Sequence, residues 1–205
     1  MATYSTVAIV NRALMLCGSS PITALTEDST NARAVNATYE ISRKTFLTEN
    51  RFTFSTTRST LATVATTVFA WLHDEEAYGY TKPSSALRIW EMSDPNVTWR
   101  EEGDYIIADT ADLGAKFAFD QDDLSKWHPY AIEAFIDKLC SDISFTILND
   151  AKKALTYLEK YEKISLPKAA TSTSQTGTHQ TVLDDAWTAS KFANGGQGDP
   201  SRSYS

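Results

Sequence analysis

Apolar helical patterns at the two ends of the 205-residue chain constrain its fold more than any other feature. Near the N-terminus, apolar residues recur at steps of three and four, which places them on one stripe of a helix: Val7, Val10, Leu14 and Cys17. Ser5 or Thr6 can cap the start of this helix, and Gly18 can end it in a left-handed conformation. Because Pro21 cannot rejoin the helix, we expect a turn there.

Three further helices are predicted. One begins at about Ser29 or Thr30, with an apolar face of Ala32, Val35, Tyr39 and Phe46. The next begins at Pro129, with a stripe of Ile132, Phe135, Ile136, Leu139, Ile143 and Ile147. The last follows Asn149 and Asp150 and buries Ala151, Ala154, Leu155, Leu158 and Tyr161. Each pair of helices exposes a stripe that it cannot cover alone, so we expect the two pairs to pack together.

Between the helices, short aromatic and β-branched segments alternate with turn residues. Four segments read as strands: 86–92, 97–101, 104–108 and 115–119. Short connections favour antiparallel neighbours, so we expect a meander of about four strands. The Thr- and Ala-rich residues 55–68 are ambiguous between a strand and an ordered loop. Six aromatic residues are expected mostly in the module core, with some at a subunit interface: Trp71, Trp90, Trp99, Trp127, Tyr78 and Tyr80.

The predicted fold is therefore an α+β four-helix bundle, built from two helix hairpins at the two ends of the chain, with an inserted antiparallel β module and an extended C-terminal arm. The bundle is expected to comprise residues 1–50 and 128–166, the module 51–127 and the arm 167–205. No stretch approaches the roughly 18 to 20 apolar residues of a membrane span, and the N-terminus lacks a secretion signal. We therefore expect a globular protein without a membrane span, made inside a cell.

The C-terminal arm is small and polar except for one apolar island. Such polar segments bury too little surface to offset their ordering entropy. The island contains Val182, Leu183, Trp187 and Phe192, and we predict that these four residues anchor the arm to a partner. Fully extended, the arm could span up to about 130 Å, so it could reach a neighbouring subunit. The alternative is that the island folds back on its own bundle.

Charge is distributed unevenly along the chain, whose net charge is −7. Residues 51–127 carry seven Lys and Arg against thirteen Asp and Glu, which leaves −6 in the module. A protein that grips duplex DNA by its phosphates needs clustered positive charge, so we expect no tight DNA binding.

Residue patterns typical of catalysis are weak in this chain. The densest polar cluster joins His73 to Asp74, Glu75 and Glu76, but it has no second His at i+4, so a solvated acidic loop is favoured over a metal site. Glu101, Glu102 and Asp104 flank a hairpin turn, where surface acids are common. Cys17 and Cys140 are expected as buried free thiols rather than a disulfide or metal ligands. We therefore predict no enzyme activity, no cofactor and no metal.

The N-terminal segment resembles the start of the head-to-tail adaptor proteins of tailed bacteriophages, called tail tubular protein A in short-tailed phages. The residues that carry the likeness are VNRALMLCGSSPITALTEDSTNARAVNATYEISRKTFLTENRFTFST. They comprise a helix ending in Gly, a Pro-Ile turn, an acidic-polar linker, an Asn-Ala-Arg helix start and a long helix that runs into an aromatic RFTF. The likeness covers about the first quarter of the chain, and each element alone has an ordinary helix-hairpin explanation.

The resemblance implies a structural virion protein that forms a ring between the portal and the tail nozzle and continues the DNA channel. The ring is expected to be a dodecamer in the neck of the virion, assembled in the cytoplasm of the host bacterium, with the portal and nozzle proteins as partners. Double-stranded DNA would pass through without tight binding, and acidic residues of the module are candidates to face the channel: Asp74, Glu75, Glu76, Glu101, Glu102 and Asp104.

Two alternatives from other classes remain open. One is a virion-associated peptidoglycan hydrolase that uses paired carboxylates, in which His73, Glu75 and Glu76 would be the residues to test. The other is a small cytosolic binding module unrelated to phage.

Overall fold

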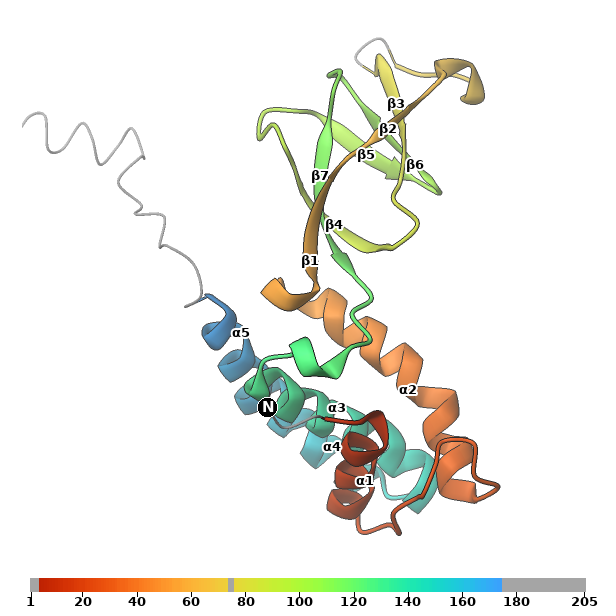
Figure 1. Cartoon of the computed structure of the whole chain (residues 1–205), viewed down its shortest axis with the longest axis vertical. Coiled ribbons are helices and arrows are strands. Elements are labelled where there is room, and N and C mark those ends of the chain that lie inside the picture. Colours follow the sequence, from red (N-terminus) through yellow and green to blue (C-terminus); the bar gives the residue numbers. More distant parts are fainter. Residues whose placement is uncertain (1–3, 74–75, 175–205) are drawn as a thin grey trace, which may run out of the picture. The chain divides into compact units, whose positions relative to one another are not determined.

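The structure is a computed structural model that describes residues 4–73 and 76–174 (Figure 1). Its helices are α1 (Thr6–Cys17), α2 (Thr30–Glu49), α3 (Pro129–Leu148), α4 (Ala151–Lys160) and α5 (Leu166–Ser174). Its strands are β1 (Thr56–Thr60), β2 (Ala62–Val64), β3 (Tyr78–Thr81), β4 (Ala86–Met92), β5 (Trp99–Glu102), β6 (Tyr105–Ala108) and β7 (Gly114–Phe119). No helix in these described ranges is long and apolar enough to cross a membrane.

The predicted fold class is wrong. In place of a four-helix bundle with an inserted meander of about four strands, the described part of the chain is an α+β mix whose seven strands form two antiparallel sheets. One sheet has the order β1-β7-β4 and the other β2-β3-β6-β5. The prediction failed because strand pairing here joins segments far apart in sequence. Short turns indicate only which consecutive strands are neighbours.

Local signals explain where the first two helices begin and end. Ser5 caps α1, because its Oγ accepts a hydrogen bond from the backbone N–H of Ala8 at 3.1 Å, and Ser29 caps α2 in the same way. Gly18 follows α1 with φ of 83°, a left-handed conformation that suits glycine. Between the helices, the side chain of Asn11 both donates to and accepts from the backbone of Ile22 at 2.8 Å, which closes the turn.

The C-terminal helical segment extends further than the sequence predicts. α4 continues through a π-helical turn, η4 (Tyr161–Ser165), into α5. Residues 167–174 were assigned to the extended arm, because Pro167 and the small polar residues after it suggest a helix end. Instead, the N–H of Leu166 bonds to the carbonyl of Tyr161, a wider turn that carries the helix past the proline, and Ala169 is buried.

The helices share one core that draws residues from both ends of the chain. α3 packs against α1, α2, α4 and α5. An aromatic cluster occupies this core around Phe46, whose ring centroid lies 4.8 Å from that of Phe52 and 5.5 Å from those of Trp127 and Phe135. Trp127 was expected in the β module but belongs to this helical core. Aromatic packing of this kind stabilises a core beyond the area that it buries.

The two sheets enclose a second, smaller core. β1 and β4 flank β7, with Arg58 opposite Lys116 and Ile89 opposite Phe117. The chain passes from β1 in one sheet to β2 in the other at Leu61, whose N–H donates to the carbonyl of Leu113 at 2.9 Å. The core residues include Leu61, Tyr80, Ile89, Met92, Ile106, Leu113 and Phe117.

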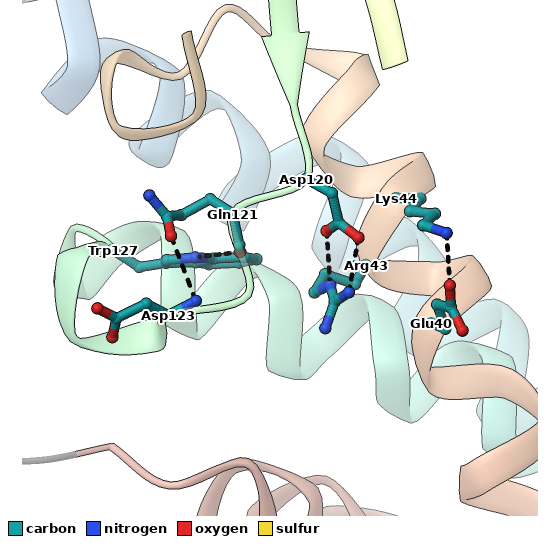
Figure 2. Close-up of polar contacts among 7 residues, drawn as sticks. All are labelled: Glu40, Arg43, Lys44, Asp120, Gln121, Asp123 and Trp127. Carbon is teal, nitrogen blue, oxygen red and sulfur yellow. Dashed lines mark hydrogen bonds and ion pairs between the residues drawn. The ribbon is translucent and has the colours of Figure 1, made fainter. Parts of the chain in front are cut away.

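An ion pair joins α2 to the segment that follows β7 (Figure 2). Arg43 donates to both carboxylate oxygens of Asp120, at 2.9 Å and 2.7 Å. In the same segment, the indole N–H of Trp127 donates to the carbonyl of Gln121 at 3.0 Å. Both groups of the ion pair are largely shielded from water, so this contact is expected to stabilise more than a surface pair does.

We expect Arg43→Ala to lower the free energy of unfolding by about 1.5 to 3 kcal/mol, because it removes two hydrogen bonds between charged groups. Urea denaturation followed by circular dichroism measures the loss. The matched control is Arg33→Ala on the same helix, whose partner Asp28 is almost fully exposed, and it should cost no more than about 1 kcal/mol. Equal losses for the two variants would show that the ion pair with Asp120 stabilises the fold no more than an exposed ion pair does.

Candidate functional site

The described acidic residues that were predicted to face a channel gather around the hairpin of β5 and β6. Glu101 and Glu102 end β5, and Gly103 turns the chain with φ of 58°. Asp104 follows, and its carbonyl accepts a hydrogen bond from the N–H of Lys82 at 2.8 Å. Asp74 and Glu75 lie outside the described residues, as do the predicted anchor residues Val182, Leu183, Trp187 and Phe192.

Two basic residues neutralise part of this acidic group. The Arg100 guanidinium lies 2.8 Å from a carboxylate oxygen of Glu76 and 2.9 Å from one of Glu102. Lys82 pairs with Glu101. With Asp104, four carboxylates and two cations leave a local net charge of −2. The group is therefore a charge-paired surface with a residual negative field, weaker than the acidic residues alone suggest.

An exposed apolar patch, made of Val68, Trp71 and Tyr78, borders the acidic group. Trp71 is 67% exposed and Val68 is 51% exposed, although Trp71 was expected mainly in a core. The guanidinium of Arg100 lies 6.0 Å from the ring centroid of Trp71, so the patch and the acids share one cation. Trp71 is also in edge contact with His73, at 5.1 Å between ring centroids.

The segment that carries this patch packs on the sheet at Gly79. Phe69 packs edge-on against Tyr105, with ring centroids 5.4 Å apart. A Cβ added to Gly79 on β3 would lie 2.5 Å from the Phe69 ring, so the ring occupies the space that glycine leaves free. Phe69 thereby holds residues 65–72 near β3 and β6.

A groove in the helical region is lined by residues of α1, α3, α4, η4 and α5. Its volume is about 220 Å³, and its lining includes Arg12, Tyr130, Glu133, Asp137, Lys160 and Lys168. The buried carboxylate of Asp137 accepts from Lys160 at 2.7 Å and from Ser165 at 2.5 Å. Since both of its oxygens are engaged within the chain, Asp137 ties α3 to the π-helical turn.

A small cavity lies beside one of the predicted acids. A cavity of about 160 Å³ lies beside Glu76, with His73, Trp99 and Arg100 in its lining, and among the residues that the structure describes Glu76 is its single carboxylate. Glycosidases use two carboxyl groups that face each other across a bound sugar, and small-molecule sites usually exceed about 300 Å³. Across residues 4–73 and 76–174 no group of three or more His, Cys, Asp or Glu side chains could hold a metal ion.

The sequence indicates the acids but does not directly identify the basic residues that pair with them. Lys82 follows β3, so its contact with Glu101 depends on how the sheet pairs. Arg100 lies on β5 itself, two positions before Glu102 and on the same face of the strand, so that contact has a local signal in the sequence. The exposure of Trp71 was missed because a tryptophan in an aromatic-rich segment is usually a core residue. Val68 and Trp71 stand in the continuous apolar run 68–72, so local composition did not indicate a surface segment.

Comparison with known proteins assigns no family to the chain, since neither a protein family nor a curated protein matches it. The resemblance to the phage adaptors therefore remains a prediction.

Proposed function

We propose that this chain is a structural virion protein: a head-to-tail adaptor whose copies form a ring between portal and tail nozzle and continue the DNA channel. The dodecameric copy number and the location in the virion neck follow from the family resemblance. In this proposal the protein is assembled in the host cytoplasm and acts by contact rather than by catalysis.

The proposal is supported most by the structural role of the residues that carry the resemblance. Asn11 closes the turn after α1, and the side chain of Asn31 donates to the carbonyl of Ser20 at 2.8 Å in the same linker. Phe52 and Phe54 of the RFTF sequence stack at 5.2 Å, and Phe54 stacks on Trp127 at 5.0 Å. The motif therefore builds a packing unit, as an assembly protein requires.

Exposed apolar residues supply surfaces for ring contacts. A closed ring needs two different patches on each subunit, because its interface is heterologous. The module offers one candidate in Val68, Trp71 and Tyr78, and the helices offer another set: Met15, Ile41, Phe145, Leu155 and Ile164. Large apolar side chains are costly to leave in water, and aromatic residues are enriched at interfaces.

The acidic group suits a surface that DNA passes without adhering. Its net charge of −2 repels phosphate, and its ion pairs hold the cations Lys82 and Arg100 away from the duplex. A map of the assembled particle that placed Glu101, Glu102 and Asp104 on the outer wall would refute this part of the proposal.

Mixing the full chain with particles that carry the portal protein of the same virus tests the proposal. We expect the wild-type chain to sediment with the particles and Trp71→Ala to weaken the affinity for them at least about tenfold, the effect of about 1.4 kcal/mol at an interface hot spot. Trp90→Ala cannot replace Trp71→Ala in this test, because the Trp90 ring lies against Arg51 and Arg88 of its own chain. The matched control is Tyr4→Ala, an exposed aromatic outside the patch. Unaltered sedimentation of the Trp71 variant would show that the patch takes no part in the assembly.

The predicted anchor is tested separately, by deleting residues 175–205. This deletion spares α5, whose Ala169 belongs to the helical core. We expect the truncated chain to fold normally and to lose attachment to the particles, because it lacks Leu183, Trp187 and Phe192. Undiminished attachment would contradict the anchoring role.

A further inference from the structure

The two cysteines of the chain meet in the helical core. Cys17 is the last residue of α1 and Cys140 lies in the middle of α3, 123 positions further on, and both are fully buried. Their sulfur atoms are 2.6 Å apart. The hydroxyl of Ser144, one turn along α3, donates to the Cys17 sulfur at 3.2 Å.

This separation is much closer to a covalent bond than to a contact between thiols. A disulfide bond measures about 2.05 Å, whereas hydrogen bonds to sulfur are usually well above 3 Å. The core therefore holds the two sulfurs closer together than two reduced thiols prefer. Bond formation would need only a small further approach and would relieve this crowding.

The surroundings also favour the reactive form of one thiol. Hydrogen bonds from Cys140 and Ser144, together with the positive charge of Lys153, lower the pKa of Cys17 to about 7 against the opposing effect of burial. The hydrogen bond with Cys17 and burial raise the pKa of Cys140 instead. Cys17 is thus the nucleophile of the pair, because the thiolate is the attacking species.

We propose that Cys17 and Cys140 are a redox modification site and form an intrachain disulfide that ties α1 to α3 when the protein meets an oxidising environment. This inference is independent of the adaptor role. Both cysteines are free and buried in the structure, as the sequence predicts, and the proposal concerns what they do under oxidation.

The oxidant is a small-molecule disulfide such as oxidised glutathione. The Cys17 thiolate attacks one of its sulfurs, the glutathione S–S bond breaks, and one glutathione leaves as a thiolate that takes up a proton. The Cys140 thiol then gives up its proton and attacks the Cys17 sulfur, which expels the second glutathione. Two protein thiols are oxidised and one glutathione disulfide is reduced to two thiols. Because both cysteines are buried, the first step occurs when the end of α1 opens locally.

The test is to incubate the folded full chain in glutathione buffers of increasing oxidising ratio until the composition stops changing. The chain is then quenched in acid, denatured and treated with N-ethylmaleimide, and its intact mass is measured. We expect a species without maleimide or glutathione, lighter than the reduced chain by two hydrogens, whose peptide map joins Cys17 to Cys140. It should run as a monomer on a non-reducing denaturing gel and unfold at a higher urea concentration than the reduced chain.

Variants separate this reaction from general thiol chemistry. Cys17→Ser and Cys140→Ser should each keep one thiol and yield no internal link. Ser144→Ala retains both cysteines and should still form the link. It therefore provides a second test of the reaction if a cysteine variant fails to fold. Two maleimide adducts on the wild-type chain at every ratio, or a product made mainly of glutathione adducts or linked dimers, would overturn the proposal.

Discussion

Phe46→Ala should lower the free energy of unfolding by about 3 to 5 kcal/mol, the range for deleting a large aromatic side chain from a packed core. Phe46 is fully buried, and its ring contacts the rings of Phe52, Trp127, Phe135 and Tyr161. These partners come from both ends of the chain, so the variant weakens the packing that holds them together. Since small domains are stable by about 5 to 15 kcal/mol, the loss is a large fraction of the total.

Equilibrium urea denaturation followed by far-ultraviolet circular dichroism measures this effect. Phe145→Ala is the matched control, because it deletes the same side chain from α3 at a position that is 59% exposed. It should change the stability of the single chain by no more than about 0.5 kcal/mol. A loss below about 1 kcal/mol for Phe46→Ala would mean that the aromatic cluster is not the centre of the core.

Glu49→Ala should lower the free energy of unfolding by about 2 to 4 kcal/mol. Glu49 ends α2, accepts a hydrogen bond from the hydroxyl of the buried Tyr161 and lies 3.4 Å from the ammonium of Lys138. Removing it leaves a buried hydroxyl without its acceptor, at about 1 to 3 kcal/mol. It also leaves a largely buried ammonium without its counter-charge, for which broken buried pairs cost about 3 to 5 kcal/mol. The partial exposure of Glu49 reduces the sum.

The control for this variant is Glu40→Ala on the same helix. Glu40 pairs with Lys44 at the surface, one turn apart, and such pairs contribute about 0.3 to 0.5 kcal/mol (Figure 2). If both variants lost the same small amount in urea denaturation, the contact of Glu49 with Tyr161 and Lys138 would have no stabilising role.

The same contact should make stability depend on alkaline pH. Burial and the hydrogen bond to Glu49 raise the pKa of Tyr161 above that of an exposed tyrosine, about 10. Below pH 10 the folded and unfolded chains both keep this proton. Above it the unfolded chain loses the proton first, so the stability conferred by Tyr161 falls as pH rises. Tyr161→Phe should have a shallower decline between pH 10 and 11 in the same urea assay.

Features set by residues close together in sequence could be predicted. The cap Ser5, the start of α2 near Ser29, the left-handed Gly18 and the start of α3 at Pro129 each depend on a few neighbouring residues, and each is present. β4 spans the residues predicted for it, since alternation of side chains is also local.

Features set by distant residues could not be predicted. β1 is rich in Thr and Ser and gains its place by pairing with β7, more than fifty positions later. α5 passes Pro167 because Ala169 packs on helices formed earlier in the chain. For the same reason the contact of Lys82 with Glu101 could not be predicted, because it depends on how the sheet pairs. Arg100 is different: it lies on β5 two positions before Glu102, so their contact follows from local spacing. Cys17 and Cys140 were seen as separate buried thiols, because sequence does not report their meeting.

The assembly claim is tested most directly by electron microscopy of the full chain mixed with the portal protein of its virus. The account predicts closed rings of this protein stacked on the portal, twelve copies if the family resemblance holds, with the β5–β6 hairpin towards the lumen. Portals without added density, together with a chain that stays monomeric at every concentration, would contradict it.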